Sequence, residues 1–139
     1  MTQPSPIAKS QAPAPGDKMP DGTIYAGISP DTGKAMYTIS TDTPLRVSFG
    51  QARKVVAGLN GDQFHGYQDW RVPTMAEVNV LFNDRAAIGG FNLSGSRSSG
   101  WYWSSSKRHG LFQTKRFSDG YESLSYGGNA DASSLRCIR

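Results

Sequence analysis

The sequence is poor in cysteine, with Cys137 as the only one among 139 residues. A single thiol excludes an internal disulfide and a cysteine-cluster metal site, so packing alone is expected to hold the fold. Cys137 lies in an apolar/charged alternation over residues 135–139, which predicts a terminal strand and a buried thiol. Neither His65 nor His109 is close to it in the sequence, so no base is placed to activate it as a nucleophile.

Long apolar runs are also missing. No stretch approaches the roughly 20 apolar residues of a membrane-spanning helix, and the N-terminus lacks the charged and then apolar pattern of a secretory signal. The sequence contains neither a phosphate-cradling glycine loop nor a His-Glu-x-x-His zinc motif. We therefore expect no membrane span, no cofactor and no metal. As written, the chain fits a cytoplasmic or virion-associated protein, although the residues do not name the compartment.

Charge is balanced over most of the chain. The net charge is +4, and residues 97–139 carry all of it, with seven Lys and Arg against three Asp and Glu. A basic patch can attract nucleic acid or an acidic protein surface. A surplus of four is also typical of ordinary solvated side chains, so nucleic acid is an alternative partner and not the expected one.

The length of the chain and its 37% of hydrophobic residues predict one compact domain. Residues 1–18 are rich in Pro, Ala, Ser and Gln and poor in large apolar groups, so we expect a disordered or extended tail there. Residues 19–139 form the predicted domain. Two runs rich in β-formers, residues 23–28 and 34–39, flank a Ser-Pro-Asp-Thr-Gly turn and predict a hairpin.

Two helices are predicted from capping boxes. Ser48 with Gln51, and Thr74 with Glu77, have the spacing at which each side chain can bond the backbone N–H of the other residue. Apolar residues follow each box at helical spacing and predict one buried face per helix. Gly61 is the expected stop of the first helix. Two helices beside short antiparallel strands make an α+β domain.

The C-terminal third combines a regular frame with an irregular interior. The motif Trp-Tyr-Trp-Ser-Ser-Ser at residues 101–106 and the final residues 135–139 enclose residues 107–131, which show no apolar/polar alternation. Short strands are expected there, joined by turns at residues 118–120 and 126–129. Binding residues concentrate on segments that a rigid scaffold holds in place, so residues 107–131 are predicted to present a recognition surface.

The expected contact residues in that segment mix tyrosine, cations and small polar groups, as binding surfaces often do. They are Arg108, His109, Leu111, Gln113, Tyr121, Ser123, Ser125, Tyr126 and Asn129. A mixed aromatic and charged face suits a protein or another surface macromolecule better than a deep pocket does. We expect a monomer without catalytic residues, because no nucleophile accompanied by a base and an orienting group is found.

Other conspicuous residues are assigned to the framework. The three tryptophans and Phe91 are expected in the core, where aromatic side chains bury a large area. Asp69 and Arg71 are expected to form a structural ion pair or turn hydrogen bonds, since no second carboxylate or base lies at a useful spacing. His65 is expected in an exposed loop.

Several motifs, in order along the chain, resemble one bacterial family. They are GYQDWRVPT at residues 66–74 with Glu77 and Leu81, Gly-Gly-Phe at 89–91, WYWSSS at 101–106, Phe-Ser-Asp-Gly at 117–120 and LRCIR at 135–139. From about residue 20 to residue 139 the chain is similar to the Lcl C-terminal domain family, also called domain of unknown function 1566. The resemblance implies a C-type-lectin-like fold.

Some members of that family are variable proteins of diversity-generating retroelements, in which a reverse transcriptase rewrites adenines of a C-terminal cassette. The resemblance implies that residues 107–131 are such a cassette. Randomising the two adenines of AAY codons reaches Arg108, His109 and Tyr121. It does not reach Lys107, Gln113, Lys115 and Glu122, which belong to unrandomised positions or other codons. The alternative is a non-diversified member that serves as a structural or adhesion domain.

The resemblance also bears on chemistry. Calcium-dependent sugar-binding lectins hold the cation with carboxylate and amide oxygens, whereas residues 103–105 read Trp-Ser-Ser and offer no carboxylate. Binding is therefore expected to be independent of calcium. Formylglycine-generating oxidases share the lectin-like fold but use a pair of cysteines, so an enzyme of that kind is the less favoured alternative.

Overall fold

A β-hairpin lies near the start of the fold. The computed structural model describes residues 13–42, 47–95, 100–128 and 133–139. β1 (Ile24–Ile28) pairs antiparallel with β2 (Ala35–Thr38), which confirms the predicted hairpin. Its turn is closed by a hydrogen bond of 2.9 Å from the Gly33 N–H to the Ser29 carbonyl.

Helices and a second sheet follow. The α-helices of the described ranges are α2 (Phe49–Gly61), α3 (Met75–Asn83) and the short α4 (Arg85–Ile88), with a 3-10 turn η1 (Phe64–Gly66) after α2. The second sheet is antiparallel, in the order β3 (Trp101–Arg108), β4 (Leu111–Arg116) and β5 (Glu122–Ser125). The domain is therefore α+β, as predicted, and α4 is an addition that the sequence did not indicate.

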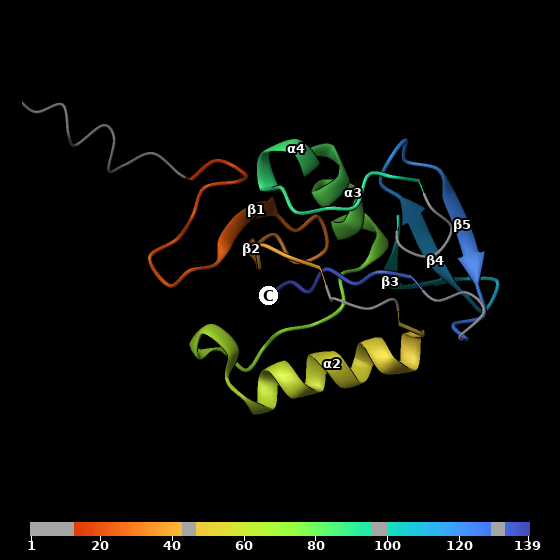
Figure 1. The fold of residues 1–139 in the computed structure, drawn as a ribbon, viewed down its shortest axis with the longest axis horizontal. Coiled ribbons are helices and arrows are strands. Elements are labelled where there is room, and N and C mark those ends of the chain that lie inside the picture. Colours follow the sequence, from red (N-terminus) through yellow and green to blue (C-terminus); the bar gives the residue numbers. More distant parts are fainter. Residues whose placement is uncertain (1–12, 43–46, 96–99, 129–132) are drawn as a thin grey trace, which may run out of the picture.

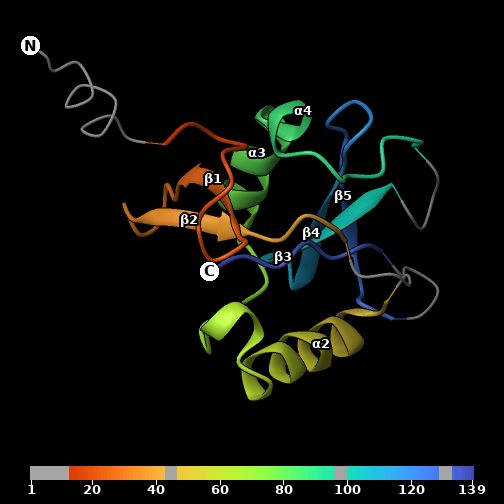
Figure 2. The ribbon, with the colours of Figure 1, turned by 60° about the vertical axis from the view of Figure 1, so that its left-hand side comes forward.

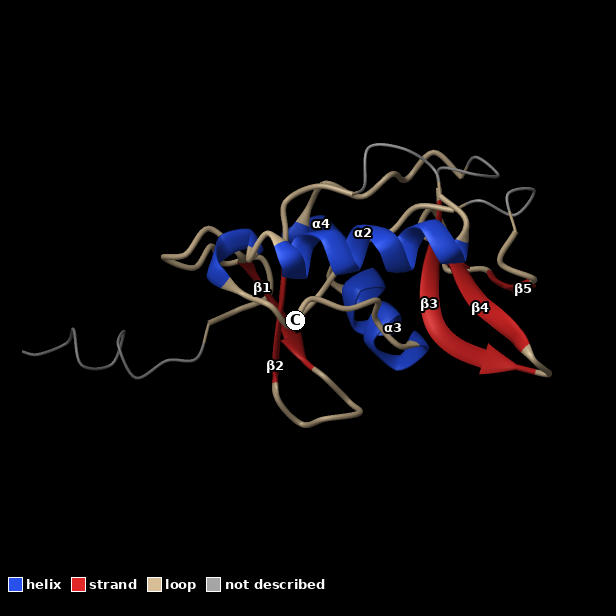
Figure 3. Cartoon of the chain, turned by 90° about the horizontal axis from the view of Figure 1, so that it is seen from below, coloured by secondary structure: helices blue, strands red, loops and turns tan. Residues whose placement is uncertain are grey.

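The helices lie on two sides of the C-terminal segment. Figures 1 and 2 show α2 on one side, α3 and α4 on the other, and the end of the chain between them. The β1–β2 hairpin and the β3–β5 sheet lie at opposite ends of the molecule in Figure 1. The β3–β4 hairpin projects away from the helices, with its turn at the edge of the molecule (Figure 3).

Both predicted capping boxes are present. Ser48 Oγ accepts a hydrogen bond from the Gln51 N–H at 3.2 Å, and Gln51 Oε1 accepts one from the Ser48 N–H at 2.9 Å. Thr74 and Glu77 form the same pair of bonds at the start of α3, at 3.3 and 2.9 Å. These bonds satisfy N–H groups that the first turn of a helix leaves without partners. α2 ends at Gly61, as expected.

Glu77 also holds an ion pair inside the protein. Arg71 donates from Nη1 and Nη2 to its two carboxylate oxygens, and the Ser29 hydroxyl donates to it as well, all at 2.6 Å. Asp69 instead pairs with Arg139, with 2.7 Å between Oδ1 and Nε. The expected structural roles of Asp69 and Arg71 hold, but they do not pair with each other, because the buried carboxylate occupies both terminal nitrogens of Arg71.

Two hydrophobic clusters fill the domain. One joins β1, β2 and α3 to Tyr102 and Phe117, and the other joins α2 to Trp103 and Cys137. The three tryptophans are between 0% and 6% exposed, so their predicted core positions are confirmed. Phe91 packs against the first cluster with part of its ring accessible. Cys137 is buried, as predicted, and His65 is exposed.

Residues 135–139 do not form the predicted terminal strand. Ile138 exchanges backbone hydrogen bonds of 2.8 and 3.1 Å with Arg71, while Arg139 exchanges bonds of 2.7 and 2.9 Å with Tyr37 of β2. The segment runs between two neighbours, and successive residues bond to opposite ones. Isolated bridges therefore replace a continuous ladder.

The described end of the predicted tail is bonded to β1. The Gly16 N–H donates to the Tyr25 carbonyl at 2.8 Å, and the Tyr25 N–H donates to the Asp17 carbonyl at 2.9 Å. Gly16 has a φ of +99°, and a Cβ there would lie 2.5 Å from the Ala87 carbonyl oxygen, so only glycine fits this close approach. The first twelve residues lie outside the described part of the chain.

Candidate ligand-binding surface

The serines of the Trp-Ser-Ser-Ser motif form an irregularity in β3. Between the paired positions Trp103 and Lys107, residues 104–106 oppose the single residue Gln113 of β4. The first serine donates from Oγ to the Gln113 carbonyl at 2.7 Å. The other two bond to the backbone of residues 73 and 75 beside the start of α3, at 2.8 and 2.9 Å. The bulge therefore anchors β3 to the framework at the point where the predicted variable segment begins.

A two-residue turn joins β3 to β4. Arg108 pairs with Leu111, and the residues between them, His109 and Gly110, have φ values of 54° and 77°. Positive φ at both central residues is the requirement of a type I′ turn, which favours Asn-Gly. His109 is exposed at the tip of the hairpin. A residue other than glycine costs about 1 kcal/mol of folding free energy when it adopts this left-handed conformation.

Four of the predicted contact residues meet at one hollow. Its lining consists of Arg108, His109, Gln113 and Ser123, together with Glu122 and Leu124, around a volume of about 230 Å³. Gln113 lies opposite Leu124 in the β4–β5 ladder, which places their side chains next to each other on one face of the sheet. The hollow offers guanidinium and amide donors beside a carboxylate acceptor, so it suits a polar partner.

The remaining predicted residues of this region do not line the hollow. Leu111 follows the turn and is partly buried. Tyr121 is 62% exposed, its ring packs edge-on against Trp101 with centroids 6.0 Å apart, and Arg116 lies 5.3 Å from its ring centre. Tyr126, just after β5, is 84% exposed. Neither tyrosine lines the hollow, so the expected contact residues are spread over a wider surface.

Ser125 is a correction to the predicted set. It is only 5% exposed and lies opposite Phe112, on the face that packs toward α2. Its hydroxyl accepts a hydrogen bond of 3.0 Å from the Gly127 N–H. Alternate residues of a strand point to opposite faces, and the register of β5 turns Ser125 inward. Asn129 lies outside the described residues.

Half of the described residues of the predicted variable segment are nevertheless exposed, and few of the rest are fully buried. Among its described residues, 107–128, the buried side chains are Thr114, Lys115, Phe117 and Ser125. Lys115 is partnered, since its Nζ lies 3.0 Å from Glu122 and donates to the Gly120 carbonyl at 3.2 Å. The frame on either side, from Trp101 to Ser104 and from Leu135 to Ile138, is buried.

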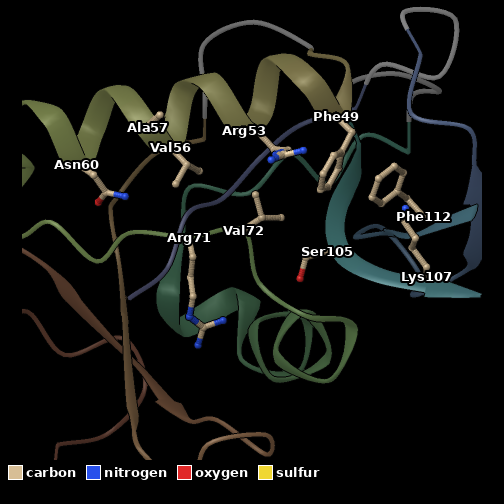
Figure 4. Close-up of a pocket in the computed structure, with 10 residues that line it drawn as sticks. All are labelled: Phe49, Arg53, Val56, Ala57, Asn60, Arg71, Val72, Ser105, Lys107 and Phe112. Carbon is tan, nitrogen blue, oxygen red and sulfur yellow. The ribbon is translucent and has the colours of Figure 1, made fainter.

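A larger pocket, which the sequence did not indicate, lies between α2 and the β3–β4 hairpin. It holds about 630 Å³ (Figure 4). Apolar side chains from both elements and from the segment before α3 line it: Phe49, Val56, Ala57, Val72 and Phe112. The polar residues of its lining are Arg53, Asn60, Arg71, Ser105 and Lys107. Helical spacing alone groups residues 53, 56, 57 and 60 on one side of α2, but the opposite wall comes from residues distant in the sequence.

Burial makes the Cys137 thiol a poor nucleophile. Burial raises the pKa of the Cys137 thiol to about 12, although the neighbouring charge of Arg136 acts in the opposite direction. The thiol is therefore protonated at neutral pH, whereas a nucleophile would be a thiolate. In the described ranges, no three His, Cys, Asp or Glu side chains gather as metal ligands. No helix there has both the length and the apolar character needed to cross a membrane.

Fold and surface together define a small α+β domain that carries an exposed C-terminal sheet. The family model described as the Lcl C-terminal domain matches residues 24–139, a span that includes every helix and strand named above. The chain belongs to the Lcl C-terminal domain family, which confirms the resemblance of its motifs. None of the curated proteins compared with the chain matches it.

Proposed function

We propose that this protein is a non-catalytic, receptor-type binding protein whose C-terminal sheet recognises a protein or another surface macromolecule. Residues 107–131 are, in this proposal, a cassette diversified by a retroelement, on a scaffold of the lectin-like type. The proposal rests above all on one observation: the side chains that hold the β3–β5 sheet are buried, while most of those between them are exposed or only partly buried.

This division of roles supports diversification because outward positions tolerate change. Surface substitutions mostly alter the free energy of unfolding by less than about 0.5 kcal/mol. Arg108 and His109 are exposed and line the hairpin hollow, so their replacement would alter the surface without opening the core. The serine bulge and the buried aromatic residues would keep the scaffold constant.

The composition of the surface supports a macromolecular ligand. Tyr121 and Tyr126 offer large exposed aromatic areas, and the hollow in the same segment has a volume of only about 230 Å³, which is small for a ligand site. Tyrosine with polar neighbours is common where one protein recognises another. Absence of catalysis is supported by the protonated thiol of Cys137.

Sequencing the surrounding locus tests the diversification. We expect a neighbouring reverse-transcriptase gene and a near-copy of codons 107–131 that differs from them only where the copy has adenine. A locus without either element would leave the binding role in place and contradict the cassette, favouring the non-diversified alternative.

A displayed library tests the binding role. Randomising positions 108, 109, 111, 121, 123 and 126 should allow selection of binders to a purified probe protein such as serum albumin, with thermal melting temperatures close to that of the parent. A matched library at six exposed positions in and beside the β1–β2 hairpin, 17, 18, 28, 31, 32 and 34, is the control. Equal yields of binders from the two libraries, or unfolded clones from the first, would contradict the proposed surface.

A further inference from the structure

The pocket beneath α2 is a second site, distinct from the hairpin hollow, although Ser105, Lys107 and Phe112 of β3 and β4 contribute to its lining. It shares no lining residue with the hollow around Arg108 and His109. Its volume of about 630 Å³ lies within the range of small-molecule sites, about 300 to 1,000 Å³. The two sites can therefore be tested independently.

The apolar part of the pocket offers an aromatic wall. The rings of Phe49 and Phe112 stack at one end with centroids 3.8 Å apart and an interplanar angle of 18°. Val56 and Val72 lie between these rings and the end marked by Asn60 (Figure 4). An aromatic or aliphatic body would find dispersion contacts and lose contact with water along this wall.

Several polar groups of the lining already have partners. The Asn60 amide accepts a bond of 2.7 Å from the Trp70 N–H and donates one of 2.9 Å to the Trp70 carbonyl. Arg71 donates hydrogen bonds from both of its terminal nitrogens to Glu77. The Ser105 hydroxyl has a longer contact of 3.4 Å with a backbone carbonyl. Asn60 and Arg71 therefore shape the wall and leave recognition of a charged group to other residues.

Arg53 and Lys107 are the lining residues that can recognise a charged group. Within the described ranges neither forms an ion pair or a hydrogen bond to an acidic side chain, and both are exposed. Lys107 Nζ lies 4.8 Å from the centre of the Phe112 ring, at the aromatic end of the pocket. No Asp or Glu is among the lining residues. Two cations therefore border an apolar space, and no described carboxylate belongs to its lining.

We infer that this pocket binds a small amphiphilic anion, with an aromatic or aliphatic body and one carboxylate. The body packs along the wall formed by Phe49, Val56 and Phe112. The carboxylate is held by the exposed cations that border this wall, Arg53 and Lys107, through charge-assisted hydrogen bonds, which are the strong ones. A single compact ligand matches a volume of this size.

Titration with matched acids and alcohols tests the site. The probes are 2-naphthoate and decanoate, each compared with its neutral alcohol, 2-naphthylmethanol or decanol. Calorimetry and amide chemical shifts of the full chain report affinity and position. We expect the acids to shift signals from α2 and from around Phe112, and to bind at least about tenfold more tightly than the alcohols.

Charge variants identify the two cations. Arg53→Gln and Lys107→Gln should each weaken binding of the acids about tenfold and leave the alcohols unchanged. Lys54→Gln is the matched control, because Lys54 follows Arg53 on α2 but points about 100° around the helix and does not line the pocket. Its affinity for the acids should equal that of the parent.

A steric variant separates the site from a general charge effect. Ala57 is exposed on α2 and lines the pocket, so Ala57→Trp should fill the space and abolish binding of the acids without lowering the melting temperature. Equal affinities for acid and alcohol, no binding of either, or unchanged affinities in all three pocket variants would overturn the inference. So would binding of an acidic aromatic peptide together with failure of both free acids.

Discussion

Arg71 donates both of its terminal nitrogens to Glu77, whose side chain is 0% exposed although that of Arg71 is 39% exposed. The same carboxylate accepts hydrogen bonds from the Thr74 N–H at the start of α3 and from the Ser29 hydroxyl beside the β1–β2 turn. One acidic group thus fastens a helix, a hairpin and the segment before the helix together. Its removal should be felt across all three.

The first prediction concerns acid stability. Burial alone would raise the pKa of Glu77, but the hydrogen bonds from Arg71, Ser29 and Thr74, with the charge of Arg71, lower it from 4.5 to about 2. A lowered pKa means that the folded protein holds the ionised form more strongly than the unfolded chain does. The stabilisation is complete above about pH 4.5 and is lost as the pH falls towards 2.

The second prediction uses a substitution to isolate that group. Glu77→Gln should lower the free energy of unfolding at pH 7 by about 3 kcal/mol, because Arg71 loses its ionised partner while the glutamine can still cap the helix. Urea unfolding at several pH values should show this difference shrinking from pH 5 to pH 3. Gln51→Ala, in the exposed capping box of α2, is the control and should cost less than about 1 kcal/mol at every pH. A constant difference for Glu77→Gln would contradict the assigned pKa.

The third prediction concerns the tip of the β3–β4 hairpin. His109 has a φ of 54° and precedes Gly110, so asparagine should suit this position better. We expect His109→Asn to raise the free energy of unfolding by about 0.5 to 1 kcal/mol and His109→Val to lower it by about 1 kcal/mol, as measured by chemical denaturation. Equal stabilities for the two variants would contradict the turn conformation.

The fourth prediction distinguishes surface tyrosines from a core tyrosine. Replacing Tyr121 and Tyr126 together with alanine should change the free energy of unfolding by about 1 kcal/mol or less, because both side chains are largely exposed, at 62% and 84%. Tyr102→Phe should cost about 2 kcal/mol, because its hydroxyl donates to Asp42 and accepts from a backbone N–H at 2.7 Å. A larger loss in the double variant than in Tyr102→Phe would assign the exposed tyrosines to the framework.

The sequence predicts the local parts of this fold well. The capping boxes and the first hairpin depend on residues three to fourteen positions apart, and their chemistry is visible in the residue types. The tryptophans follow from their size and apolar character. The absence of apolar/polar alternation in residues 107–131 likewise indicates the accessible segment of the C-terminal third.

The rest depends on contacts between residues far apart in the chain. Arg136 belongs to an alternation that predicts a strand, yet it is 1% exposed and its Nη2 lies 2.9 Å from Asp42. The stack of Phe49 on Phe112 likewise joins α2 to β4. The register of β5 against β4 decides which face of the sheet Ser125 occupies, and it turns this side chain inward. Residue types alone do not fix that register. The α2 pocket was missed for the same reason.

The three-serine bulge has a consequence for engineering. Its bonds run to backbone atoms beside α3 and to the Gln113 carbonyl, so they do not depend on which side chains lie at the tip. The residues of the hairpin tip can accordingly be replaced together as one unit. We expect foreign hairpins transplanted between Lys107 and Phe112 to keep the host fold whenever they preserve the two-residue turn and its spacing from the serine bulge.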